Sequence, residues 1–221
     1  MLSILRKARL KDKEMRILML YIPLGFLSQH ILIASGSGLD NAGKTTIVKR
    51  IMNEDITTVS PTLGFIIKTI DFNGYKLNIW DVGGQRTLRS YWKNYFEKTD
   101  TLIWVVDATD RLRVEDCRQE LTGLLLEEVG EHPISLLQSR NIHTDAAGYL
   151  QRLMGASLMV FLNKTDVEEC MTEEEVRERL GLDSIKTHKW TILPCSAMTG
   201  KNLKEGLSWV VQDAKDRLFL Y

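Results

Sequence analysis

The sequence has no excess of charge of either sign. Its 29 lysine and arginine residues balance 29 aspartate and glutamate residues, so the formal net charge at pH 7 is +0. Proteins that bind nucleic acid through its phosphates usually carry a strongly basic surface. The composition therefore gives no support for a nucleic-acid partner.

Cysteine is scarce as well. Cys117, Cys170 and Cys195 are odd in number and far apart in the chain. This usage is typical of a reducing compartment and does not indicate a disulfide framework. The first residues are charged and lack the apolar segment of a cleavable signal peptide. We therefore expect a cytoplasmic protein.

Features that would anchor the chain in a membrane are also missing. Residue 2 is leucine, whereas N-myristoylation requires glycine at that position, so we expect no such modification. The apolar run 17–34 contains Pro23, Gly25 and several polar residues, whereas a spanning helix needs about 20 apolar residues. We expect no stable membrane anchor. Apolar and basic residues nevertheless alternate at helical spacing near the start, which predicts an amphipathic helix over 1–14.

A phosphate-binding motif lies at residues 38–45, Gly-Leu-Asp-Asn-Ala-Gly-Lys-Thr, which match G-x-x-x-x-G-K-[ST]. Its glycines let the backbone curl so that several N–H groups point at one anion. Lys44 adds a positive charge, and the Thr45 hydroxyl can ligate Mg²⁺. The residues that we expect to contact the nucleotide here are Gly38, Asp40, Asn41, Ala42, Gly43, Lys44, Thr45 and Thr46.

A second motif, Asp81-Val-Gly-Gly84-Gln85, follows an apolar strand pattern. The Asp81 carboxylate at a strand end can hold Mg²⁺ through water, in its outer shell. Gly84 can bring its N–H close to a γ-phosphate, and Gln85 can orient an attacking water because its amide both donates and accepts. Thr62, in Pro-Thr-Leu-Gly-Phe, is the candidate second Mg²⁺ ligand. Lys44, Thr62 and Gln85 are thus the predicted catalytic residues.

Two later segments indicate a guanine base. Asn163-Lys-Thr-Asp166 follows an apolar run, and a carboxylate such as that of Asp166 can accept two N–H bonds from guanine that adenine cannot offer. The backbone N–H groups of Cys195-Ser196-Ala197 could meet guanine O6. The residues expected around the base are Asn163, Lys164, Asp166, Ser196 and Ala197.

Strand and helix patterns alternate along the chain. Strands are predicted at 16–20, 64–71, 76–81, 101–107, 157–163 and 190–195, and helices after residue 43 and at 89–97, 113–128, 172–180 and 202–218. Thr172-Glu-Glu-Glu175 is a capping box. Such alternation predicts an α/β fold: a six-stranded, mostly parallel sheet with helices on both faces, and ligand loops at the carboxyl ends of the strands. We expect one domain over 15–221 after the N-terminal helix.

The order of these motifs resembles that of the small GTPases, and the segments G-L-D-N-A-G-K-T-T, P-T-L-G-F and W-D-V-G-G-Q resemble those of the Arf family. The resemblance implies the P-loop small-GTPase fold and a switch that binds GTP or GDP with Mg²⁺ and hydrolyses GTP. It also implies an effector surface at Phe65, Trp80 and Tyr95. The N-terminal helix would then either pack on its own domain or be displaced when GTP binds.

The resemblance further implies partners: a GTPase-activating protein, tubulin folding cofactors and lipid-binding carrier proteins, with a role in microtubule function and a cytoskeletal association. No arginine immediately precedes Thr62 to act within the chain. Because an arginine supplied by a partner accelerates related switches by about 10³–10⁵, we expect slow hydrolysis without an activating partner.

Two segments, 21–37 and 129–151, interrupt the family pattern. Natural loop insertion costs little entropy and is plausible for 129–151, which joins a helix to a strand away from the motifs. It is a poor explanation for 21–37, which would separate the phosphate loop from its strand. Alternatively, 30–34 could replace 16–20 as the central strand. We favour a third interpretation, translated introns, because the pattern resumes intact after each segment. If segment 21–37 disrupts the phosphate loop, the chain would be a nucleotide-free interaction protein or a non-functional isoform. A generic P-loop ATPase is a further alternative, but such a protein would not need Asn163–Asp166.

Overall fold

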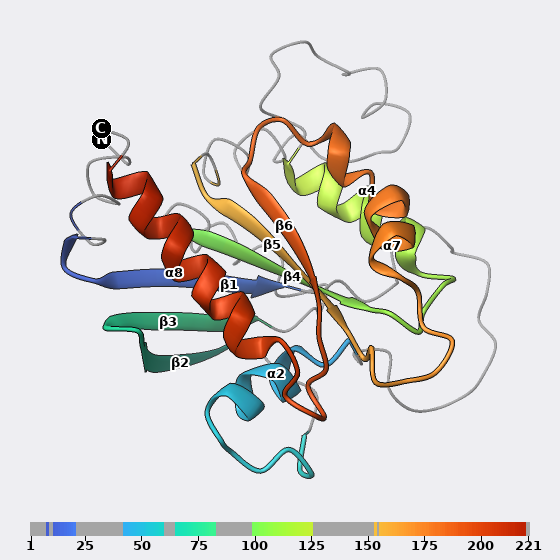
Figure 1. The fold of residues 1–221 in the computed structure, drawn as a ribbon, viewed down its shortest axis with the longest axis horizontal. Coiled ribbons are helices and arrows are strands. Elements are labelled where there is room, and N and C mark those ends of the chain that lie inside the picture. The colour runs from blue at the N-terminus through green and yellow to red at the C-terminus, as the bar shows by residue number, and fades with distance from the viewer. Residues whose placement is uncertain are drawn as a thin grey trace.

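The computed structural model describes residues 8, 11–20, 42–59, 65–82, 99–125, 153 and 155–219. It contains a six-stranded sheet in the order β2-β3-β1-β4-β5-β6 (Figure 1). The strands are β1 (Glu14–Leu20), β2 (Phe65–Phe72), β3 (Tyr75–Val82), β4 (Thr101–Asp107), β5 (Ser157–Asn163) and β6 (Trp190–Pro194). Only the β2–β3 pair among them is antiparallel, so the predicted mostly parallel sheet is confirmed.

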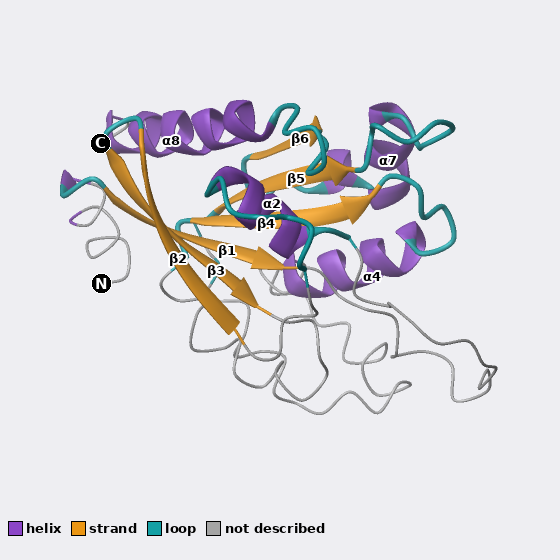
Figure 2. Ribbon diagram, turned by 90° about the horizontal axis from the view of Figure 1, so that it is seen from below, coloured by secondary structure: helices purple, strands orange, loops and turns teal. Residues whose placement is uncertain are grey.

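Helices cover both faces of this sheet. They are α2 (Lys44–Ile51), α4 (Val114–Leu125), α7 (Glu173–Leu180) and α8 (Leu203–Phe219), with a 3₁₀ turn at Leu182–Ser184. Figure 2 shows α8 and α4 on opposite sides of the strands. One buried cluster joins α4 and α7 to the sheet, and a second joins α2 and α8 to the other face. Alternate residues of β1 contribute to the two clusters, because successive side chains of a strand point to opposite faces.

The central position in the sheet belongs to β1. Ile17 pairs with Ile79 of β3 on one side, and Leu18 pairs with Leu102 of β4 on the other. Over residues 17–19 both hydrogen-bonding edges of β1 are therefore occupied by neighbouring strands. The interpretation in which residues 30–34 displace this strand is wrong.

Several predictions fall outside the described residues. These are the helix at 89–97, the segments 21–37 and 129–151, and all of the N-terminal helix except residues 8 and 11–14, where the Asp12 N–H donates to the Ala8 carbonyl at 3.1 Å. Within the part of the chain that the structure describes, no helix combines the length and apolar character needed to cross a membrane.

Candidate nucleotide-binding site

The candidate site lies where the parallel strands end. Figure 2 shows the arrows of β1, β4 and β5 pointing in the same direction. The loops after the carboxyl ends of such strands form the usual ligand crevice of an open α/β sheet. Four predicted segments leave the sheet or begin a helix there: 42–46, Asp81, 163–166 and 195–197.

The described end of the phosphate loop has the geometry of an anion site. Gly43 is the N-cap of α2, with φ 86° and ψ 21°, and no acidic residue lies in the first turn of the helix. The positive end of the helix dipole at this first turn favours an anionic ligand. A Cβ on Gly43 would lie 2.4 Å from Nδ2 of Asn163, so the close approach of this loop to β5 requires glycine.

Thr45 and Asp81 form the next part of the site. The Thr45 hydroxyl donates to Oδ2 of Asp81 at 2.7 Å, and Asp81 is 1% exposed. Burial raises the pKa of the Asp81 carboxyl, while the positive charge of Lys44 and the hydrogen bond from Thr45 oppose the rise. Oδ1 of Asp81 has no hydrogen-bond partner among the described residues. A buried acceptor without a partner is costly, so this atom indicates a place for a further donor such as metal-bound water.

These residues fit Mg²⁺. A hydroxyl and a carboxylate side by side supply the oxygen atoms that Mg²⁺ prefers, and Mg²⁺ commonly takes its remaining ligands from water and substrate phosphates. The described residues contain no group of three or more histidine, cysteine, aspartate or glutamate side chains that could enclose a metal ion. Thr45 and Asp81 together suit a metal that is shared with a phosphate ligand.

Asn163 joins the phosphate loop to the predicted base loop. Its Nδ2 donates to the Ala42 carbonyl at 2.8 Å, and its Oδ1 accepts the Ala197 N–H at 2.9 Å. Asn163 is 1% exposed, so these bonds are protected from water. The Ala197 N–H was expected to meet guanine O6. Because it already has an acceptor in Asn163, any bond to O6 from this N–H would have to be shared.

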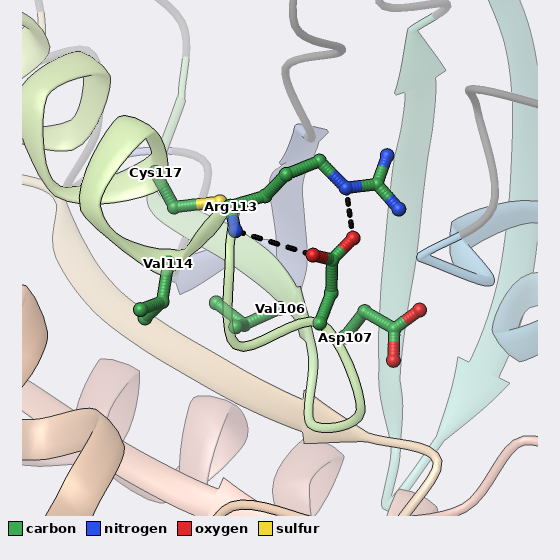
Figure 3. Close-up of a pocket in the computed structure, with 6 residues that line it drawn as sticks. Val106, Asp107, Arg113, Val114 and Cys117 are labelled. Carbon is green, nitrogen blue, oxygen red and sulfur yellow. Dashed lines mark hydrogen bonds and ion pairs between the residues drawn. The ribbon is translucent and has the colours of Figure 1, made fainter.

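Lys164 is held by a residue outside the predicted motifs. Its backbone has φ 69°, and its Nζ forms an ion pair with Oδ2 of Asp107 at 2.6 Å. Oδ1 of Asp107 accepts bonds from the N–H and hydroxyl of Thr109, at 2.9 and 2.6 Å. A second carboxylate, that of Asp110, lies nearby: the Asp110 N–H donates to the Asp107 carbonyl at 3.2 Å, and the Asp110 side chain pairs with Arg113. Figure 3 shows Asp107 and Arg113 among the residues that line a small pocket.

The remaining base-site residues lie close to this cluster. Asp166 is exposed at the surface, while Thr165 donates its hydroxyl to the Cys195 carbonyl at 2.8 Å. Ser196 is fully buried, and its hydroxyl accepts the Thr199 N–H at 3.1 Å. Burial raises the pKa of the Cys195 thiol to about 12, and the negative charge of Asp166 adds to the rise. The structure thus brings the 163–166 and 195–197 segments into contact.

The structure describes part of the predicted effector surface. Phe65 and Trp80 lie on neighbouring strands and their rings stack, with centroids 6.3 Å apart and an interplanar angle of 25°. Phe65 is 51% exposed. Other predicted site residues lie outside the described residues: Gly38, Asp40, Asn41, Thr62, Gly84, Gln85 and Tyr95.

Two polar residues near the site, Asp107 and Arg50, were missed by the sequence reasoning. Asp107 could have been found, because it ends a strand that neighbours β5 at the same edge of the sheet. Arg50 gave no such indication, because it lies in a helix and outside every nucleotide motif. Its Nε donates to the Ala197 carbonyl at 3.0 Å.

Comparisons with known proteins agree with this geometry. Residues 26–214 match the model of the ADP-ribosylation factor family. The chain is 46% identical over 220 residues to ADP-ribosylation factor-like protein 2 of Dictyostelium discoideum, covering 100% of this chain and 98% of that protein. It is 46% identical over 221 residues to the protein of the same name from Arabidopsis thaliana, covering 100% and 98%.

A solved structure shares the fold. This is the Arl6 BBS3 small GTPase of Trypanosoma brucei with the bound nucleotide analogue GppNp, with a TM-score of 0.64 and 22% identity, covering 92% of this chain and 98% of that one. The family match spans most of the chain, and the two relatives align with nearly all of it. The chain therefore belongs to the ADP-ribosylation factor family of small GTPases, which bind GTP or GDP with Mg²⁺ and hydrolyse GTP.

Proposed function

We propose that this chain is a guanine-nucleotide switch with slow intrinsic hydrolysis, and that the residues described above carry out its binding and chemistry. The observation that carries the proposal is the buried Asp81 carboxylate. One of its oxygens accepts from Thr45 and the other has no partner among the described residues, beside the start of α2. This arrangement is suited to a metal-bound phosphate.

The phosphates would lie at the start of α2. In this proposal Lys44 and the backbone N–H groups of 40–46 hold the phosphate oxygens, and Thr45 and Thr62 offer their hydroxyls to the metal. Asp81 would accept hydrogen bonds from water bound to the metal. Bound Mg²⁺ would neutralise negative charge on the phosphates.

Hydrolysis is assigned to residues of the second motif. Gln85 orients the attacking water, since its amide can accept from the water and donate to an oxygen. Gly84 donates its N–H to the γ-phosphate. Loss of that phosphate releases Thr62 and Gly84, so both segments relax, which is the switch.

The base would be held by two contacting loops. Asp166 accepts from guanine N1 and N2, Asn163 and Ser196 shape the pocket, and the stem of Lys164 lies along the base. Ala197 contributes its N–H to O6, shared with Asn163. The contacts between these loops support this assignment, because they join the two predicted base segments to each other and join Asn163 to the Ala42 carbonyl of the phosphate loop.

We infer the biological role of this chain from its resemblance to named relatives. The relatives are named ADP-ribosylation factor-like protein 2, and we propose a similar role as a regulator of tubulin folding, microtubule function and lipidated-cargo carriers. The proposed partners are a GTPase-activating protein, a tubulin folding cofactor and lipid-binding carrier proteins, which would read Phe65, Trp80 and Tyr95. The location would be cytoplasmic with a cytoskeletal association, without a myristoyl anchor.

A nucleotide-free interaction protein is not favoured, because family members bind guanine nucleotide.

A single-turnover assay of GTP hydrolysis tests the proposed chemistry. The wild-type protein alone should hydrolyse GTP slowly, at less than about 1 per minute, since no arginine is supplied. Gln85→Leu should retain GTP binding and lose about 10²-fold or more in the hydrolysis rate. Gln212→Leu is the matched control, because Gln212 lies on the exposed surface of α8, bonded to Asp216. Fast hydrolysis by the isolated wild type, or normal hydrolysis in Gln85→Leu, would contradict the proposal.

A further inference from the structure

Arg50 connects the phosphate-loop helix to the base loop. It lies in the last turn of α2, outside every nucleotide motif. Its Nε donates to the Ala197 carbonyl at 3.0 Å, and its Nη2 donates to the Met198 carbonyl. A Cβ on Gly200 would lie 3.8 Å from Cδ of Arg50, so the side-chain stem runs along this glycine. One side chain thus holds two consecutive carbonyls of the 195–200 loop.

These bonds fix the direction of a backbone N–H group. The Ala197 carbonyl and the Met198 N–H belong to one planar trans peptide, in which the two groups point in opposite directions. A guanidinium on the carbonyl therefore orients the Met198 N–H and polarises it as a donor. The preceding N–H, that of Ala197, donates to Oδ1 of Asn163. The Met198 N–H is thus the donor in this loop whose direction Arg50 fixes.

The 195–200 loop, which we call the base loop, is bonded to residues near both ends of α2. At the start of the helix, Asn163 bridges the Ala42 carbonyl and the Ala197 N–H, at 2.8 and 2.9 Å. At the end of the helix, Arg50 takes the carbonyls of Ala197 and Met198. The loop that faces the base is therefore tied to the same helix whose first turn faces the phosphates. Arg50 is a charged donor, so its bonds are stronger than those between neutral groups.

We propose that Arg50 is a positioning residue for guanine recognition, which aims the Ala197–Met198 amides at O6 of the base. The inference rests on the proposed function of this loop in reading O6. Lys49, the preceding residue, provides a contrast. Its Nζ donates to the carbonyls of Asp55 and Thr58, at 3.1 and 2.7 Å, and so holds a segment other than the base loop.

Nucleotide release rates test this inference in the full chain. The probes are GDP and 2-aminopurine riboside 5′-diphosphate, which carries the same phosphates but has no O6. Arg50→Met should speed GDP release by about tenfold, the effect of losing one charge-assisted hydrogen bond. It should change release of the 2-aminopurine nucleotide by less than about twofold, because that ligand makes no O6 contact. Lys49→Met, the control, should change both rates by less than about twofold.

Arg50→Lys separates positioning from folding. Lysine keeps the charge but has no planar fork for two carbonyls, so GDP release should be accelerated by about threefold, again with selectivity for GDP. If Arg50→Met does not fold, this variant carries the test. Equal acceleration of both nucleotides, or no acceleration of either, overturns the inference. Wild-type protein that releases the two nucleotides equally fast would instead refute the proposed reading of O6, before any substitution is made.

Discussion

At the residue scale, the side chains around the base site depend on partners that are distant in the sequence. Lys164 is held by Asp107, which lies 57 residues earlier, and Ala197 is held by Arg50, which lies 147 residues earlier. The motif letters predict that Lys164 and Ala197 face a nucleotide. They do not indicate what orients these residues, because the partners meet only through the order of the strands. This is why Asp107 and Arg50 were missed.

Asp107→Asn should weaken nucleotide binding through Lys164. In the wild type, Oδ2 of Asp107 lies 2.6 Å from Nζ of Lys164. The asparagine amide carries no negative charge, so it should hold the lysine stem less firmly along the base. We expect GDP release to accelerate by about threefold to tenfold, measured with a fluorescent GDP analogue. Asp110→Asn is the matched control. It removes a neighbouring carboxylate that pairs with Arg113, whereas Lys164 pairs with Asp107. Its effect on GDP release should be small. Equal effects of the two variants would contradict this role of Asp107.

The cysteines should differ in reactivity. Burial raises the pKa values of the Cys117 and Cys195 thiols to about 12. At pH 8 each would be about one part in ten thousand thiolate, the reactive form, and both side chains are also shielded. Cys170 is partly exposed. A thiol-disulfide reagent should therefore modify Cys170 first in the folded protein and all three thiols after denaturation. Rapid modification of Cys195 in the native protein would show that the base loop is open.

At the scale of helices and strands, the close packing of α8 on β5 depends on a glycine. A Cβ on Gly206 would lie 2.4 Å from Cζ of Phe161 and 3.3 Å from the sulfur of Met159. Gly206→Ala should therefore destabilise the protein by about 1–3 kcal/mol, because a buried ring must move. Urea denaturation measures this change.

Gly123→Ala is the control, and we expect it to change the stability of the protein in the opposite direction. Gly123 lies in α4, is exposed, and has open space where a Cβ would be placed. Alanine should stabilise the helix by about 0.5–1 kcal/mol, since it is the better helix former. If Gly206→Ala is neutral or stabilising like Gly123→Ala, the packing of α8 on Phe161 is not as tight as described.

Local patterns predicted most of the described elements. The strands at 101–107 and 157–163 were predicted with the bounds that the structure shows, because each is a continuous apolar run, typical of a parallel strand buried on both faces. The capping box is also confirmed. The Thr172 hydroxyl accepts the Glu175 N–H, and the Glu175 carboxylate accepts the Thr172 N–H, at the start of α7. Strand ends were less accurate, since β6 ends at Pro194 and the pattern extends to Cys195.

At the scale of the whole molecule, alternation of strands and helices predicted the mostly parallel sheet and the edge at which the motifs meet. It could not decide the order of the strands around the first segment. Residues 16–20 and 30–34 are both short apolar runs, and only the pairing of β1 with β3 and β4 identifies the central strand. The base and phosphate segments were predicted as neighbours because parallel strands bring their carboxyl ends together.

The segments 21–37 and 129–151 remain the least expected part of the chain. We propose that they are translated introns, because the family pattern resumes after each one. Transcript reads across codons 20–38 and 128–152 should then include shorter forms that lack both segments. Uniform read coverage through both segments would contradict this origin and favour natural insertions.

The measurement that tests the central claim most directly is the nucleotide content of the purified 221-residue protein, determined by denaturation and chromatography. We expect a stoichiometric amount of GDP or GTP and no adenine nucleotide, because the phosphate and base loops meet at the carboxyl edge of the sheet. A protein that is purified empty and does not take up GDP in the presence of Mg²⁺ would contradict the account of this chain as a guanine-nucleotide switch.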